Sequence, residues 1–207
     1  MDSSSYDTLR AWLATGSINL FGRPFAGKDT QGTRLADLFD GVLIGGGDIL
    51  RGATMPDHIK AGMKTGELIP TKDYIAIVLP KLMDESLHGK PLILSSVGRW
   101  NGEQEGVMHA TAASDHPMKA VIYLSVPEEV VRERWKIYAG THQRGERHDD
   151  TAEVLEIRLK EYREKTLPVL EWYRAHGLLI EVDGTQSSDA VHAEIIAKLL
   201  SRASTSP

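Results

Sequence analysis

The chain contains no cysteine. This absence excludes disulfide bonds, thiolate catalysis and zinc sites that use cysteine ligands. The chain also has no apolar run that approaches the roughly 18 residues of a membrane span. Residues 1–5 are Met-Asp-Ser-Ser-Ser and have neither the basic region nor the apolar core of a signal peptide. We therefore expect a cytoplasmic protein without a membrane partner.

Acidic residues outnumber basic residues in this chain. The sequence has 24 Lys and Arg against 29 Asp and Glu, which gives a formal net charge of −5. A nucleic-acid-binding protein would present a basic face, so no nucleic-acid partner is expected. The 41% of hydrophobic and 26% of charged residues are typical of a globular chain. Its 207 residues suffice for a single α/β domain over 1–207, and we expect a monomer.

Short apolar segments alternate with longer amphipathic segments along the chain. This alternation predicts an α/β fold, a parallel five-stranded sheet with helices on both faces. In such a sheet, ligands bind beyond the carboxyl ends of the strands. The expected strands are 17–21, 42–44, 91–94, 120–124 and 178–182, and the expected helices are 6–15, 30–39, 56–64, 72–88, 103–113, 128–138, 151–176 and 188–201. Pro168 should kink the helix 151–176, and the residues from 202 onward should fray.

The first expected strand runs directly into a glycine-containing loop. Residues 22–28 read Gly-Arg-Pro-Phe-Ala-Gly-Lys and match the phosphate-loop pattern Gly-x-x-x-x-Gly-Lys, with the hydroxyl of Thr30 one position later than usual. Backbone N–H groups of such a loop, the N-terminus of the following helix and the lysine charge together bind phosphate. A turn beside a surface lysine is the alternative interpretation. The preceding strand and the following helix favour the phosphate loop.

Arginines recur where strand ends and loops are expected to converge. They follow the second, third and fourth strands or surround the polar loop 140–148. Arginine recognises phosphate oxygens through two parallel hydrogen bonds and stays charged. Phosphoryl transfer depends on positioning and on neutralising charge, so it needs several such groups. These arginines are Arg51, Arg99, Arg134, Arg144, Arg147 and Arg158.

Several segments, in one order along the chain, resemble the adenylate kinase family of nucleoside monophosphate kinases. The phosphate loop with Thr30-Gln31 is similar to that family's Gly-x-Pro-Gly-Ala-Gly-Lys-Gly-Thr-Gln. Further segments follow between about residues 18 and 200, nearly the whole chain. They are Gly47-Asp48-Ile49-Leu50-Arg51, Gly66-Glu67-Leu68-Ile69-Pro70, Arg147-His148-Asp149-Asp150, the helix with Arg158, Leu159, Tyr162, Thr166 and Pro168, and Val182-Asp183-Gly184-Thr185.

The resemblance implies a role for each matching position. It implies catalytic roles for Lys28, Arg99, Arg147 and Arg158. It implies an ATP site formed by Gly22, Phe25, Ala26, Gly27, Lys28, Asp29, Thr30, Arg134, Gly184 and Gln186. It implies a monophosphate site formed by Gly46, Arg51, Leu68, Ile69, Ser96, Arg99, Glu103 and Gln104.

The resemblance also implies a metal and two mobile parts. Thr30 and Asp48 would hold Mg²⁺, partly through water. Residues 45–75 would form the monophosphate-binding subdomain, and 139–149 a short lid loop. Closure of the lid would exclude water, so that the acceptor rather than water is phosphorylated.

Several positions depart from the family pattern. Phe25 and Asp29 replace two glycines of the loop, and Ser95 replaces an aspartate that supports Mg²⁺. Tyr138 replaces an arginine for which Arg144 is a candidate substitute and Lys136 a weaker one. The base-reading glutamine corresponds to a glutamate at position 103, followed by a glutamine at 104. The glutamate could accept from two N–H groups of guanine, whereas the glutamine, after a shift of one residue, would suit adenine.

The resemblance implies an ATP-dependent nucleoside monophosphate kinase with Mg²⁺ as cofactor and AMP as the expected acceptor. ATP and a nucleoside monophosphate are thus the expected partners. Three alternatives stay open at this point. They are a kinase for another monophosphate such as GMP, UMP or CMP, a nucleotide-binding protein with weak or no turnover, and a kinase of a non-nucleotide metabolite.

Overall fold

Five parallel strands form the centre of the molecule in the order β2-β3-β1-β4-β5. A computed structural model describes residues 3–54, 57–141 and 151–205. All four strand pairings are parallel, so every carboxyl end points to the same edge. The predicted fold class is therefore confirmed. The strands are β1 (Ser17–Gly22), β2 (Val42–Gly45), β3 (Leu92–Ser95), β4 (Met118–Ser125) and β5 (Leu179–Asp183).

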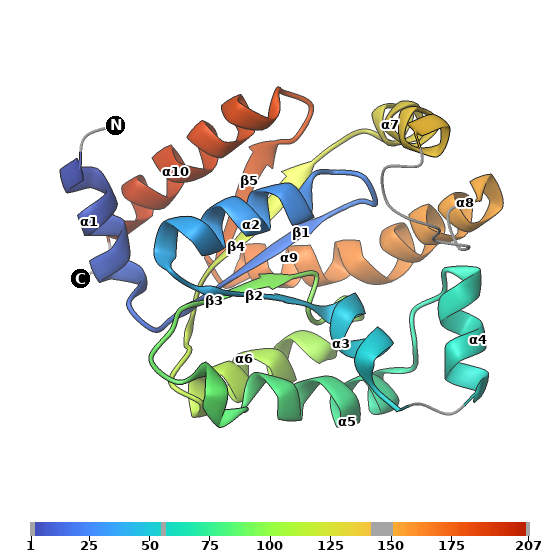
Figure 1. Ribbon diagram of the computed structural model, residues 1–207, viewed down its shortest axis with the longest axis horizontal. Helices are drawn as coiled ribbons and strands as arrows, with labels where there is room; N and C mark the ends of the chain where they lie inside the picture. Colours follow the sequence, from blue (N-terminus) through green and yellow to red (C-terminus); the bar gives the residue numbers. More distant parts are fainter. Residues whose placement is uncertain (1–2, 55–56, 142–150, 206–207) are drawn as a thin grey trace.

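Helices cover both faces of this sheet (Figure 1). One face is covered by α1 (Ser3–Leu13), α2 (Lys28–Phe39) and α10 (Ser188–Thr205). The other face is covered by α5 (Thr71–Leu82), α6 (Glu103–Ala113) and α9 (Leu167–Ala175). The remaining helices lie toward the carboxyl edge: α3 (Gly46–Gly52), α4 (Asp57–Thr65), α7 (Glu128–Thr141) and α8 (Ala152–Glu161).

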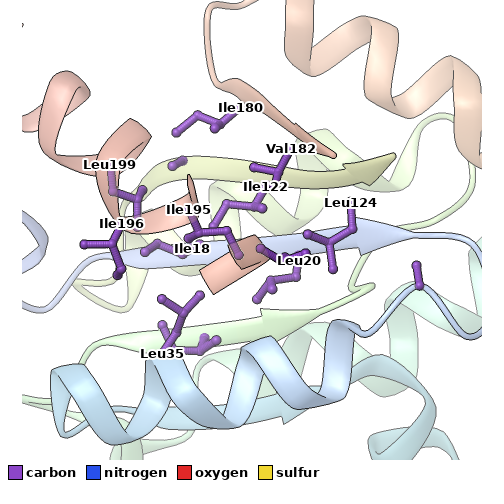
Figure 2. Close-up of a cluster of buried hydrophobic side chains, with 14 of the residues drawn as sticks. Ile18, Leu20, Leu35, Ile122, Leu124, Ile180, Val182, Ile195, Ile196 and Leu199 are labelled. Atoms are coloured by element: carbon purple, nitrogen blue, oxygen red, sulfur yellow. The ribbon is translucent and has the colours of Figure 1, made fainter. Parts of the chain in front are cut away.

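Side chains of the strands alternate between two apolar cores, because successive residues of a strand point to opposite faces. In β4, Ile122 and Leu124 pack into the core beneath α2 and α10, whereas Val121 and Tyr123 pack toward α5 and α9. Figure 2 shows the first core, in which Leu20 lies among side chains of β4, β5 and α10. Burial on both faces explains why the strands read as continuous apolar runs.

The helix expected over 72–88 is shorter than predicted. Helix α5 ends at Leu82, and a separate 3₁₀ turn covers Glu85–Leu87. Asp84 starts this turn, because its side chain accepts a hydrogen bond from the backbone N–H of Ser86 at 3.0 Å. Such an N-cap favours a new turn over continuation of the helix. The prediction of one helix to residue 88 was therefore wrong beyond Leu82.

The helix expected over 151–176 is interrupted. A π-helical segment, Tyr162–Thr166, separates α8 from α9 and ends just before Pro168. The N–H of Leu167 donates to the carbonyl of Tyr162, five residues earlier. Proline lacks the N–H that a regular turn would need, so the irregularity precedes it. The predicted kink is thus realised as a π segment.

The expected fraying of the C-terminal residues is wrong over 202–205. Helix α10 continues to Thr205. The guanidinium of Arg202 donates to the carbonyl oxygen of Leu178 at 2.8 Å and fixes the helix to the start of β5. In the described ranges, every helix is too short or too polar to cross a bilayer.

Loss of packing in the first core provides a test of the fold. Leu20 is fully buried between β4 and α10. Leu20→Ala should lower the free energy of unfolding by about 2–5 kcal/mol, because a cavity replaces the lost methyl groups. Ile137→Ala, at a side chain that is 66% exposed, is the control and should change it by less than about 0.5 kcal/mol. Urea unfolding measures both, and equal losses would contradict the assigned core.

Candidate active site

A cavity of about 860 Å³ opens at the carboxyl edge of the sheet. The phosphate loop, the loop after β3, helices α3 and α4 and one residue of α8 surround it. The fold thus brings together segments that are far apart in sequence. The predicted site residues that line it are Gly22, Phe25, Gly27, Lys28, Asp29, Gly46, Asp48, Arg51, Leu68, Ile69, Ser96, Arg99, Glu103 and Arg158.

The phosphate loop wraps around its own lysine. The Lys28 ammonium donates to the carbonyl oxygens of Gly22 and Arg23, both at 2.9 Å. Gly27 precedes α2 with a φ of 94°, a conformation that favours glycine. No side chain caps α2 within the described residues, so the N–H groups of its first turn can bind an anion. The loop therefore has the local geometry of a phosphate site.

Phe25 replaces a loop glycine in a left-handed conformation, with a φ of 59°. This conformation is uncommon for a bulky residue and costs free energy. The ring of Phe25 lies 5.7 Å from that of Tyr138, and its carbonyl oxygen accepts from Arg134 at 3.2 Å. Arg134 also donates to the carbonyl of Gly184 at 2.7 Å. Two departures from the family pattern, Phe25 and Tyr138, therefore contact each other.

Buried polar side chains fix the loop that follows β3. Asn19 of β1 donates to the carbonyl of Val97 at 2.7 Å and accepts from its N–H at 3.4 Å. The hydroxyl of Tyr74 accepts from the N–H of Gly98 at 2.7 Å. These bonds satisfy backbone groups that would otherwise be buried without partners. The loop that carries Arg99 is thereby held in place by β1 and α5.

Three arginines face the cavity from different elements. Arg51 of α3 forms an ion pair with Asp48, and Arg158 projects from α8. Within the described part of the chain, Arg99 has no carboxylate at ion-pair distance. Burial lowers the pKa of Arg99, and the like charge of Arg158 lowers it further. This concentration of positive charge favours a polyanionic ligand.

Glu103 is the buried acid of the site. It is only 2% exposed at the first turn of α6, and its carboxylate accepts from the N–H of Trp100 at 3.0 Å. Burial raises the pKa of Glu103 to about 7, although this hydrogen bond and the nearby Arg99 act against the rise. The side chain therefore gains or loses its proton near neutral pH.

Gln104 is bonded within the turn that precedes α6. It is also buried, but its side-chain carbonyl accepts from the N–H of Gly102 at 2.7 Å, and its amide nitrogen lies 3.4 Å from Asn101 Oδ1. The amide is thus used within its own turn. Glu103 lines the cavity, whereas Gln104 is not among the described lining residues. The geometry favours Glu103 as the residue that meets a ligand.

The site offers oxygen ligands of the kind that Mg²⁺ takes. Asp48 and Asp29, both exposed, line the cavity together with Ser95. Mg²⁺ usually binds one or two carboxylates, substrate phosphates and several waters, so no closed cage is needed. Among the described residues, no group of three or more acidic or histidine side chains is arranged to hold a metal ion. Thr30 is exposed and is not among the described lining residues, so the fit rests on Asp48 and Asp29.

Four further predicted ATP residues are not among the described residues of the cavity wall. Arg134 and Gly184 contact each other, Ala26 is buried, and Gln186 donates to Glu194 at 2.6 Å and to the carbonyl of Asp183 at 3.2 Å. Ala26 follows Phe25 in the phosphate loop, and Arg134 links the carbonyl oxygens of Phe25 and Gly184. Their roles stay predictions.

Part of the expected site lies outside the described residues. Arg147, Arg144 and most of the expected lid 139–149 fall in the range 142–150. The roles implied for these two arginines, and for the lid, are therefore neither supported nor contradicted.

The sequence did not indicate several of the lining residues, and three of these lie on α4. Lys60, Met63 and Lys64 line the cavity, and their spacing places them on one face of a helix. The helical spacing of these three residues is visible in the sequence. No local feature of the sequence shows that this face of α4 lies toward the cavity. Nothing in the sequence marked Tyr74 as a residue of the site, because its hydroxyl acts by accepting a hydrogen bond from the distant backbone N–H of Gly98.

Comparisons with known proteins agree with this geometry. The adenylate kinase family model matches residues 20–178. The chain belongs to the adenylate kinase family. Curated relatives include adenylate kinases of Methylobacterium nodulans, 36% identical over 84% of this chain and 91% of the relative, and of Cyanothece sp., 34% identical over 85% and 91%. The adenylate kinase of Methanosarcina mazei is 32% identical and covers 88% of this chain and 98% of the relative.

Membership of the adenylate kinase family confirms the resemblance drawn from the sequence segments. The residues that depart from the family pattern in the sequence analysis include Phe25, Ser95, Glu103 and Tyr138. Three of these, Phe25, Ser95 and Glu103, line the cavity.

The burial of Glu103 predicts a pH-dependent effect on stability. A raised pKa in the folded chain means that ionisation costs stability, which falls as pH rises from about 4.5 to about 7. A glutamine at this position does not ionise, so the Glu103→Gln variant should not lose this stability. The difference in free energy of unfolding, variant minus parent, should increase by about 2–3 kcal/mol from pH 5 to pH 8.

Urea unfolding at the two pH values measures this difference. Glu105→Gln, an exposed position on the same helix, is the matched control and should show no such trend. A constant difference between the Glu103→Gln variant and the parent would mean that Glu103 is not desolvated in the folded chain.

Proposed function

We propose that this chain transfers the γ-phosphoryl group of ATP directly to the phosphate of AMP, giving two molecules of ADP. The enzyme class predicted from the sequence, a nucleoside monophosphate kinase, is confirmed by the family membership. One observation supports the assignment of the active site to this cavity. The phosphate loop with Lys28 and the arginines Arg51, Arg99 and Arg158 line a single cavity.

The donor half would be the phosphate loop. Lys28 leaves the carbonyl oxygens of Gly22 and Arg23 and donates to phosphate oxygens instead. The N–H groups at the start of α2 bind the same phosphates. Lys28 would thereby exchange two neutral carbonyl oxygens for phosphate oxygens that carry negative charge.

The acceptor half would be formed by Arg51 and Arg99. Two guanidinium groups can hold a terminal phosphate through paired hydrogen bonds and fix it for in-line attack. Arg158 enters the cavity from α8 and would neutralise charge on the transferring group. No covalent intermediate is required, because donor and acceptor phosphates share one cavity.

Mg²⁺ would supply charge neutralisation on the β- and γ-phosphate oxygens when it is bound with ATP. Asp48 would hold it through water, and Asp29 is a second carboxylate on the same wall. The role inferred from the sequence for Thr30 rests on the family pattern alone.

A second candidate function is nucleotide binding with little turnover. Phe25 occupies a backbone conformation that costs free energy, and a serine stands at position 95 where the family pattern has an aspartate. Both features lie in the donor half. This candidate predicts binding of ATP by calorimetry without formation of ADP.

A coupled assay of ADP release separates these functions. With ATP and Mg²⁺, AMP should be phosphorylated, and GMP, CMP, UMP, dTMP and a panel of phosphorylated metabolites are tested beside it. The absence of product with every acceptor, from protein that is folded and binds ATP, would leave the binding function. A metabolite preferred over all the nucleotides would contradict the proposed acceptor class.

Lys28→Met tests the assigned donor site. Loss of one preorganised charge at the transferring group should lower kcat/KM by about 10²–10³-fold. Lys90→Met, at an exposed lysine outside the described cavity lining, is the control and should keep the parent rate. Undiminished activity of the Lys28→Met variant would remove the phosphate loop from the mechanism.

Other attributes stay predictions from the sequence and from the family. They are a role in nucleotide biosynthesis, a cytoplasmic location, a monomeric state, and the lack of nucleic-acid and membrane partners. The monophosphate-binding subdomain over 45–75 belongs with them.

A further inference from the structure

Three segments around the active site meet at one carboxylate, that of Glu128. This residue is the first of α7, and its side chain is only 17% exposed. Its carboxylate accepts hydrogen bonds from Arg163 at 2.6 Å and from Arg132 at 3.1 Å. The Nε atom of Arg23 lies 3.9 Å from the same carboxylate. These arginines belong to the π segment, to α7 and to the phosphate loop, so Glu128 joins parts of the chain that are far apart in sequence.

Arg23 attaches the phosphate loop to the segment that leads into α7. Its guanidinium donates to the carbonyl oxygen of Val126 at 2.9 Å and lies 5.3 Å from the centre of the Tyr162 ring. Its Nε atom is buried and has no hydrogen-bond partner among the described residues. A charged group in such a place depends on an opposite charge nearby, which Glu128 supplies. The carbonyl oxygen of Arg23 accepts from Lys28, so this anchor holds the part of the loop that binds the lysine.

Arg132 extends the network from Glu128 to helix α8, which lies beside α7 (Figure 1). It donates to both carboxylate oxygens of Glu156, at 2.7 and 2.9 Å. Paired hydrogen bonds of this kind fix orientation as well as distance. Glu156 lies two residues before Arg158 on α8, and Arg158 lines the cavity. A continuous path of ion pairs and hydrogen bonds thus joins the phosphate loop to the helix that carries Arg158.

Helix α8 is also held by apolar packing. Leu155 and Leu159 are buried in the first core. Apolar packing keeps the helix against the sheet but is not directional, whereas hydrogen bonds between charged groups are. A single exposed ion pair contributes little to stability, but a network that shares a half-buried carboxylate can fix the position of a helix. The network therefore adds a constraint on where α8 places Arg158.

We propose that Glu128 is a positioning residue, which holds helix α8 at a fixed place relative to the phosphate loop so that Lys28 and Arg158 act on the same phosphoryl group. Glu128 is not among the described residues of the cavity lining, so its effect passes through the residues that it holds. The inference rests on the proposed function, because it requires a phosphoryl group in transfer between these two residues. Such a transfer tolerates little displacement of the groups around it.

Glu128→Gln removes the charge and keeps the size of the side chain. Displacement of Arg158 affects the transition state more than the binding of substrates. The value of kcat should therefore fall about 10–100-fold, while the KM values for ATP and AMP change less than about threefold. Glu129→Gln, at the exposed neighbouring position, is the matched control and should keep the kcat of the parent. An unchanged kcat in the Glu128→Gln variant, or an equal fall in both variants, would overturn the inference.

Arg158→Met provides a background in which the effect of Glu128 should disappear. If Glu128 acts by placing Arg158, its replacement matters only while that arginine is present. Adding Glu128→Gln to Arg158→Met should therefore lower kcat by less than about twofold. A loss as large as that in the parent would mean general damage to the structure and would overturn the positioning role.

The position of α8 can also be measured without turnover, since the chain has no cysteine of its own. Spin labels are attached at Asp37→Cys on α2 and Lys160→Cys on α8, two exposed positions. Double electron–electron resonance should give a narrow distribution of distances between the labels, which broadens when Glu128→Gln is added. Glu129→Gln should leave this distribution unchanged.

Arg132→Gln is the second variant for this measurement, in case Glu128→Gln folds poorly. It breaks the link to Glu156 and leaves Arg23 and Arg163 beside Glu128. The distribution should broaden in this variant too. A distribution that stays narrow in both variants would overturn the inference, even if the rate falls.

The two proposals fail in different ways. A distribution that broadens as expected, in a protein that phosphorylates no acceptor, would overturn the proposed function and would support the role of Glu128 in placing α8. Turnover of AMP with an unchanged kcat and an unchanged distribution in the Glu128→Gln variant would overturn the positioning role alone.

Discussion

The structure depends on positive charge that the fold gathers at one edge of the sheet. Lys28 and Arg134 each donate to two backbone carbonyl oxygens. These carbonyl oxygens fix the positions of the two cations. Arg99 has no carboxylate at ion-pair distance among the described residues. Cations arranged in this way repel one another, and a polyphosphate relieves that repulsion, so affinity for nucleotides follows from the fold.

The scaffold opposes this repulsion through buried polar contacts. Asn19 and Tyr74 bond the backbone of the loop that carries Arg99, and parallel pairing places that loop beside the phosphate loop. The two apolar cores provide the stability that such a site requires. Phe25 adds a cost of its own, which its contacts with Tyr138 and Arg134 offset in part.

The sheet, the phosphate loop and the arginines could be predicted because each has a local pattern. Buried parallel strands read as apolar runs, and the loop reads as spaced glycines before Lys28. The different positions of Glu103 and Gln104 could not be predicted. The turn before α6 donates a backbone hydrogen bond to each of these side chains, and only the tertiary fold decides that Glu103 lines the cavity. The cavity face of α4 and the left-handed Phe25 likewise depend on tertiary contacts. The segment 142–150 lies outside the described residues, so the expected lid stays a prediction.

The central claim is that one cavity holds two nucleotides with their phosphates in contact. Competitive binding of a bisubstrate analogue, two adenosines joined by a polyphosphate chain, tests it most directly. Calorimetry should find one analogue bound per chain, and that molecule should exclude both ATP and AMP, with affinity that falls as salt rises. An analogue that displaces ATP yet leaves AMP binding unchanged, or that binds twice per chain, would contradict a shared cavity.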